Sequence, residues 1–149
     1  MTTVFWFRRD LRLFDNPALS EAISQAAASA DNRVVPLFII DPKVFDGAAE
    51  KQQVYQNCSL TSLNNSLGGK LLITHGDPEK KVLEIALAAK ATSVHISEDF
   101  EPYGRLRDNK VEAILNKNSI KLIRTGSPYA VSPLRVRKDD GTPYRVFTP

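Results

Sequence analysis

Two short segments of this chain concentrate the side chains that could bind a charged or planar ligand. In residues 8–12, three arginines surround Asp10, and guanidinium groups can hold carboxylates or phosphates through paired hydrogen bonds. Residues 98–105 combine acidic and aromatic side chains, which can accept hydrogen bonds from a planar ring: Glu98, Asp99, Phe100, Glu101 and Tyr103. Each segment also has a plainer interpretation, as salt bridges that shape a loop or as acidic residues that cap a helix.

The signatures of self-contained catalysis are absent from the sequence. No glycine-rich dinucleotide or P-loop motif follows an apolar run, and no serine stands in a Gly-x-Ser-x-Gly elbow. His75 and His95 are far apart and have no clustered ligands, and a single cysteine cannot form an internal disulfide. We expect His95 to be a buried histidine and Cys58 to fill the core. The sequence therefore predicts no catalytic residue and no metal site.

Five apolar runs alternate with amphipathic stretches, and together they predict the scaffold for these segments. Strands are expected at residues 4–7, 33–40, 70–74, 93–97 and 120–124. Their lack of polar alternation favours a parallel sheet covered on both faces. Asn16-Pro17 and Asp77-Pro78 are typical helix starts, and two more helices are expected at residues 50–67 and 104–118. We expect the helix at 50–67 to bury four side chains, Val54, Cys58, Leu63 and Leu67.

Strand–helix alternation predicts an α/β fold, an open doubly wound five-stranded parallel sheet of Rossmann-like form. With the strand order 3-2-1-4-5, the ligand crevice lies at the carboxyl edge between the first and fourth strands. The loops that leave those two strands are residues 8–12 and 98–105. The topology therefore places both chemically loaded segments at one crevice.

Composition and charge narrow the class of protein. The chain has 149 residues, 42% of them hydrophobic, and a formal net charge of +3, which suits one soluble globular domain. No apolar run approaches the roughly 20 residues needed to cross a bilayer, so we expect a soluble cytoplasmic protein without a membrane partner. Residues 121–149 carry six basic and two acidic side chains, whereas the first 120 carry 14 and 15. The near-neutral body argues against a nucleic-acid-binding face there.

The strand–helix pattern stops after Thr125. Residues 126–149 contain four of the nine prolines and an Asp-Gly turn signal, which is typical of an irregular connector. Apolar patches at residues 129–131 and 146–147 have no evident packing partner. We expect them to be exposed and to allow self-association through the tail.

Several of these segments resemble one known family. Residues 4–13, Val-Phe-Trp-Phe-Arg-Arg-Asp-Leu-Arg-Leu, with Asp-Asn-Pro-Ala-Leu at 15–19, resemble the opening of DNA photolyases and cryptochromes. Leu-Phe-Ile-Ile-Asp-Pro at 37–42, Asp-Phe-Glu-Pro-Tyr-Gly-Arg at 99–105 and Pro-Tyr-Arg-Val-Phe-Thr-Pro at 143–149 are similar to further segments of that family. The resemblance covers essentially the whole chain.

The resemblance implies that residues 1–125 are the N-terminal antenna-chromophore-binding domain and that residues 126–149 begin an interdomain connector. In that family a helical FAD-binding domain repairs pyrimidine dimers by light-driven electron transfer and meets the DNA, and we expect it to be absent from these 149 residues. The chain is thus expected not to be catalytic by itself and to have that domain as its partner. Tyr103-Gly104 stands where folate-binding members have Asn-Glu, so a deazaflavin or flavin antenna is favoured over folate. The cofactor-binding residues implied are Asp99 and Glu101, which would hydrogen-bond the ring, with Phe38, Arg9, Phe100 and Asp10 around it.

Two other functions remain open at this point. The chain could be a stand-alone nucleotide-binding or stress-type α/β module, although no glycine-rich phosphate loop supports it. It could also be an interaction fragment that binds no ligand. Binding of a chromophore, of ATP or of neither would discriminate among the three.

Overall fold

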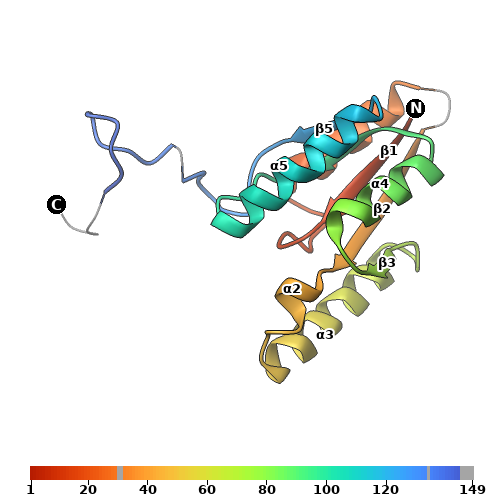
Figure 1. Ribbon diagram of the computed structural model, residues 1–149, viewed down its shortest axis with the longest axis horizontal. Coiled ribbons are helices and arrows are strands. Elements are labelled where there is room, and N and C mark those ends of the chain that lie inside the picture. The colour runs from red at the N-terminus through yellow and green to blue at the C-terminus, as the bar shows by residue number, and fades with distance from the viewer. Residues whose placement is uncertain (30–31, 134, 145–149) are drawn as a thin grey trace.

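The computed structural model describes residues 1–29, 32–133 and 135–144 and contains a parallel sheet with helices on both faces (Figure 1). The strands are β1 (Thr2–Phe7), β2 (Arg33–Ile40), β3 (Leu72–His75), β4 (Ala91–Ile96) and β5 (Lys121–Arg124). The helices are α1 (Pro17–Ala27), α2 (Pro42–Phe45), α3 (Glu50–Ser66), α4 (Pro78–Ala88) and α5 (Pro102–Lys117). Each predicted strand is present, with ends shifted by at most two residues.

The sheet has the predicted order, β3-β2-β1-β4-β5, and every neighbouring pair is parallel. Strands β2 and β3 are added on one side of β1, and β4 and β5 are added on its other side, so the strand order reverses at β1. The doubly wound α/β prediction is therefore confirmed. The carboxyl ends of β1, β2 and β4 form the edge where a ligand is expected.

Two apolar clusters hold the layers together, one on each face of the sheet. The first joins β1, β2, β4 and β5 to α4 and α5, and its buried members include Trp6, Val82 and Leu115. The second joins β1 and β2 to α1 and α3 through residues such as Phe5 and Leu60. Alternate residues of β1 thus pack on opposite faces, as expected for a strand buried on both sides.

The predicted helix starts at Asn16-Pro17 and Asp77-Pro78 are confirmed. The Asn16 side chain accepts a hydrogen bond from the backbone N–H of Leu19, and Asp77 accepts one from Glu79. In each helix, proline occupies the first turn, where its missing N–H leaves no hydrogen bond unmade.

The prediction for the buried side of α3 was partly wrong. Leu63 is buried, but Val54 is 55% exposed and Cys58 is exposed as well. At 100° per residue, Val54 and Cys58 lie about 120° and 160° around the helix from the buried Leu60. Cys58 is therefore a surface thiol, and the inward stripe consists of Leu60 and Leu63, with Leu67 partly buried.

His95 is a core residue, as predicted. Its Nε2 lies 2.9 Å from Oε1 of Gln25 on α1 and 3.1 Å from Oγ of Ser93, whereas its Nδ1 has no hydrogen-bond partner among the described residues. Burial lowers the pKa of His95, with partial opposition from Glu21, so the folded chain favours the neutral ring.

The described part of the tail, residues 126–133 and 135–144, contains no helix or strand and extends away from the sheet (Figure 1). Tyr129 and Val131 are 41% and 54% exposed, which confirms the first predicted apolar patch. The second, residues 146–147, lies outside the described residues. No helix in the described part of the chain is both long and apolar enough to cross a membrane.

Candidate functional site

The loop after β1 is held by Asp10, whose carboxylate is buried and fully engaged within the protein. Oδ1 accepts a hydrogen bond from the backbone N–H of Arg8, and Oδ2 accepts one from Ser97 Oγ at 2.6 Å. The Asn16 amide, which also caps α1, donates to Oδ2 at 3.3 Å. Asp10 therefore joins the ends of β1 and β4 and positions the arginines on either side of it.

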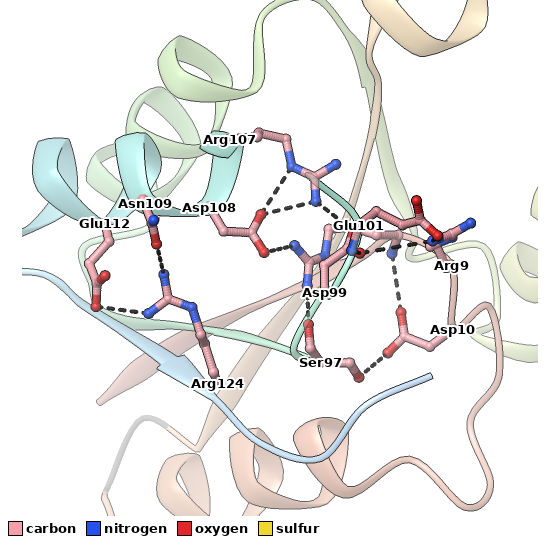
Figure 2. Close-up of polar contacts among 11 residues, drawn as sticks. Arg9, Asp10, Ser97, Asp99, Glu101, Arg107, Asp108, Asn109, Glu112 and Arg124 are labelled. Carbon is pink, nitrogen blue, oxygen red and sulfur yellow. Dashed lines mark hydrogen bonds and ion pairs between the residues drawn. The ribbon is translucent and has the colours of Figure 1, made fainter. Parts of the chain in front are cut away.

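A network of buried ions fills the edge between β1 and β4 (Figure 2). Arg8 pairs with Asp108 at 2.5 Å and also donates to the carbonyl oxygen of Ser97. Arg107 pairs with Asp108 at 2.9 Å and with Asp99 at 3.4 Å. Burial lowers the pKa of Arg8, while Asp108 opposes that shift, and the guanidinium remains charged at neutral pH. Buried charges of this kind need partners, and here each has one.

Trp6 lies beneath two of these guanidinium groups. The Cζ atoms of Arg8 and Arg107 are each 5.1 Å from the ring centroid of Trp6, within the range of cation–π attraction. Arg107 also lies 5.7 Å from the ring of Tyr103. The one tryptophan of the chain therefore connects the ionic network to the apolar core.

The carboxylate of Asp99 packs closely against Gly104 at the start of α5. Asp99 Oδ1 accepts a hydrogen bond from the backbone N–H of Glu101 at 3.1 Å. A Cβ atom on Gly104 would lie 2.1 Å from Asp99 Oδ2, so any side chain at position 104 would displace the carboxylate. The glycine is needed for space, and it lets Asp99 pack against the first turn of the helix.

A cavity of about 150 Å³ opens on the other side of β1, toward β2. Its apolar walls include Trp6, Phe38 and Ile39 from the two strands and Phe45 from α2. Arginine side chains from β1's loop and from α5 add positive charge, and Asp41 is the one carboxylate among the lining residues. The full lining is Trp6, Arg8, Arg9, Phe38, Ile39, Asp41, Val44, Phe45, Gln56, Pro78 and Arg107.

One hydrogen bond connects β2 to α5 next to this cavity. Tyr103 Oη donates to Asp41 Oδ2 at 2.5 Å, while Oδ1 of the same carboxylate accepts from the backbone N–H of Lys43 at 3.0 Å. Partial burial and the interaction with Asp41 raise the pKa of Tyr103, so the phenol stays a donor at neutral pH. Asp41 thus caps α2 with one oxygen and binds the phenol with the other.

The structure divides the six predicted cofactor-binding residues between these regions. Phe38 and Arg9 line the cavity. Asp99 and Glu101 do not; they lie at 3.8 and 3.5 Å from Arg9, whose side chain is 53% exposed. The remaining two face the protein itself, since Asp10 is buried in the β1 loop and Phe100 lies 6.2 Å from the ring of Tyr129.

Sequence reasoning missed most of the cavity wall. Trp6, Asp41 and Arg107 were not among the predicted site residues, although Asp41 directly follows the second strand and precedes a helix-starting proline. Tyr103 and Arg107 are four residues apart on one helix, a spacing that places them on one face beside the switch point. These two patterns could have identified the residues; the approach of α2 and α3 to the cavity could not be read from local spacing.

The comparison with known families is decisive for membership. The protein-family model described as DNA photolyase matches residues 3–149 of this chain. The chain belongs to the DNA photolyase family. This confirms the resemblance carried by residues 4–13 and 99–105.

Individual photolyases support the assignment. The chain is 34% identical over 98% of its length to a deoxyribodipyrimidine photo-lyase of Synechococcus sp.. It superposes with a TM-score of 0.83 on the class III photolyase of Agrobacterium tumefaciens, at 28% identity over 98% of the chain and 30% of that protein. The archaeal photolyase of Sulfolobus tokodaii gives a TM-score of 0.74 at 31% identity, covering 85% of this chain and 29% of that one. That structure is described as holding two FAD molecules and as implying a novel light-harvesting cofactor.

The chain spans 51% and 30% of the lengths of two curated relatives that it matches. It corresponds to the N-terminal α/β domain of photolyases, whose full chains have a further catalytic domain. Within the described residues no group of His, Cys, Asp and Glu side chains has the arrangement of a metal site.

Proposed function

We propose that this domain binds a tricyclic antenna chromophore, a deazaflavin or a flavin, in the cavity between β1 and β2. The cavity carries the proposal, because it combines aromatic walls, arginine donors and one carboxylate acceptor at the switch point of the sheet. Trp6 and Phe38 would contact the ring faces, and Arg9 and Arg107 would donate to ring oxygens. The bound chromophore would supply light absorption, for which the protein needs to provide position and orientation rather than a nucleophile.

The size of the cavity sets a condition on this proposal. About 150 Å³ is enough for one benzene-sized ring, whereas pockets for larger ligands have about 300–1,000 Å³. The exposed side chain of Arg9 and the hydrogen-bonded side chain of Tyr103 are the boundary groups that a larger ring would displace. Asp99 and Glu101 would then act through Arg9, and their direct hydrogen bonds to the ring stay a prediction.

Titration with candidate chromophores tests the proposed function. We expect saturable one-to-one binding of riboflavin and 5-deazariboflavin, detected by absorption and by equilibrium dialysis, and no saturable binding of tetrahydrofolate or ATP. Binding of ATP alone would favour the stand-alone nucleotide-binding module instead. Asp99→Ala with Glu101→Ala tests the predicted ring contacts, which require weaker binding in that double variant.

A matched pair of valines on the surface tests the location. Val44 lines the cavity and is 54% exposed, whereas Val54 on α3 is 55% exposed and lies outside it. Val44→Trp would occupy the cavity and reduce affinity at least about tenfold, while Val54→Trp would leave it unchanged. Equal affinities in the two variants would place the ligand elsewhere.

We further propose that the partner of this domain is a helical FAD-binding domain, and that light-dependent repair of pyrimidine dimers and contact with DNA belong to that domain. The relatives named photo-lyases support this, as does the nearly neutral charge of residues 1–120. The exposed apolar side chains of the tail, including Tyr129 and Val131, would be covered in such an assembly. Alone, the chain would self-associate through them, and sedimentation should show a larger species at high concentration that Tyr129→Ser with Val131→Ser removes.

A further inference from the structure

Asp41 is in an unusual position for a carboxylate at the end of a strand. It is 8% exposed and lines an otherwise aromatic and arginine-rich cavity. One oxygen is committed to the backbone N–H of Lys43, and the other, Oδ2, accepts the phenol of Tyr103 from the opposite wall. These two residues are 62 positions apart in the chain, so the contact depends on the tertiary fold.

The edge chemistry of a flavin or deazaflavin matches this arrangement. The pyrimidine part of either ring presents an N–H donor between two carbonyl acceptors. In the cavity wall, the carboxylate of Asp41 is accompanied by the guanidinium groups of Arg8, Arg9 and Arg107. An acceptor flanked by donors is the complement of that ring edge, and hydrogen bonds to charged groups are the stronger ones.

We propose that Asp41 and Tyr103 determine the specificity of the cavity. Asp41 Oδ2 is the acceptor for the ring N–H, and the Tyr103 phenol occupies that acceptor until a ligand with a suitable donor replaces it. Rings without such a donor leave the phenol in place and the cavity at the size of a single ring. This inference rests on the proposed function, because it assigns the residues that recognise the antenna ring.

The contacts around the cavity allow the Tyr103 phenol to move more easily than the side chains of Arg8 and Arg107. Tyr103 is 36% exposed and is stacked loosely on Arg107 at 5.7 Å, so its side chain can rotate toward solvent. Arg107 is held by both Asp99 and Asp108, and Arg8 by Asp108. Displacing either arginine would break an ion pair to a buried carboxylate, which costs more than moving a partly exposed phenol.

The test compares riboflavin with 3-methylriboflavin, which lacks the ring N–H, in the whole chain and its variants. Wild-type protein should bind riboflavin about tenfold more tightly than the methylated probe, measured by quenching of Trp6 fluorescence and by dialysis. Tyr103→Phe should strengthen riboflavin binding about tenfold and leave 3-methylriboflavin unchanged. Asp41→Asn keeps an oxygen for the α2 cap and should reduce the preference for riboflavin to less than about twofold.

Controls separate this inference from the proposed function. Tyr129→Phe, which changes a tyrosine outside the cavity lining, should leave both affinities unchanged, and far-ultraviolet circular dichroism checks that each variant is folded. Equal binding of the two probes by wild-type protein, or equal shifts of both in Tyr103→Phe, would overturn the specificity role while leaving antenna binding intact. Absence of tricyclic binding in every variant would overturn both.

Discussion

The two sides of β1 at the carboxyl edge of the sheet differ in what occupies them. Toward β4, a network of buried charges fills the space. Arg8 pairs with Asp108, and Arg107 pairs with both Asp99 and Asp108 (Figure 2). Toward β2, aromatic side chains and Asp41 surround a cavity. The strand order identifies the edge, but side chains that satisfy one another close one half of it, and the other half contains the cavity. Rigid ionic packing on the β4 side holds the arginine wall of the cavity on the β2 side.

The largest expected effect comes from removing Asp108, the carboxylate that Arg8 and Arg107 share. Asp108→Ala should lower the free energy of unfolding by about 3–5 kcal/mol, because it leaves two buried guanidinium groups without their shared partner. Urea denaturation provides the measurement. Glu112→Ala, which breaks the more exposed pair with Arg124, is the matched control and should cost less than about 1 kcal/mol. A similar small loss in both variants would mean that the network does not organise the edge.

The second test concerns the close fit of α5 against Asp99. Gly104→Ala should lower the free energy of unfolding by about 1–3 kcal/mol, because the new Cβ would overlap the carboxylate. Gly47→Ala is the matched control, since no atom lies within 4 Å of the Cβ position there. Thermal unfolding of both variants gives the comparison, and equal stabilities would contradict the tight packing of this side.

His95 on β4 is an acid-sensitive group. Its ring lies on the face of the sheet that α1 covers, opposite the ionic network. Because burial lowers its pKa in the folded chain, the unfolded chain binds a proton more readily as the pH falls below about 6.5. The free energy of unfolding should therefore have its full value above that pH and should decrease below it. Urea denaturation at a series of pH values should show a smaller decrease for His95→Gln than for wild-type protein. An equal decrease in the two proteins would contradict this role of His95.

The smallest expected effect is at Arg9, between the two sides. Its side chain is half exposed and its ion pairs to Asp99 and Glu101 are long, so Arg9→Ala should change the free energy of unfolding by less than about 1 kcal/mol. The same substitution should weaken binding of riboflavin, because Arg9 lines the cavity. A large loss of stability without a loss of binding would assign Arg9 to the ionic network instead.

The sequence predicted the sheet, its strand order and the edge, because β-strand and helix patterns are local and the connection rules leave few topologies. It also brought residues 8–12 and 98–105 together correctly, as the ion pairs of Arg9 with Asp99 and Glu101 show. It did not predict that these charges would satisfy each other. That outcome depends on Asp108 in the second turn of α5, which pairs with both Arg8 and Arg107 and has no local sequence signal for this role. The exposure of Cys58 was missed because the buried side of α3 was assigned from scattered apolar residues, whereas Leu60 and Leu63 define it.

The location of the bound ring is the most direct test of the proposed cavity between β1 and β2. Backbone amide NMR spectra of the chain, recorded with and without riboflavin, would report which edge the ligand occupies. If the ring binds between β1 and β2, the largest shifts should fall on residues 38–45 and on the indole N–H of Trp6, with smaller ones at residues 97–101. Shifts confined to residues 97–101 would contradict it, because they would place the ring at the β1/β4 edge.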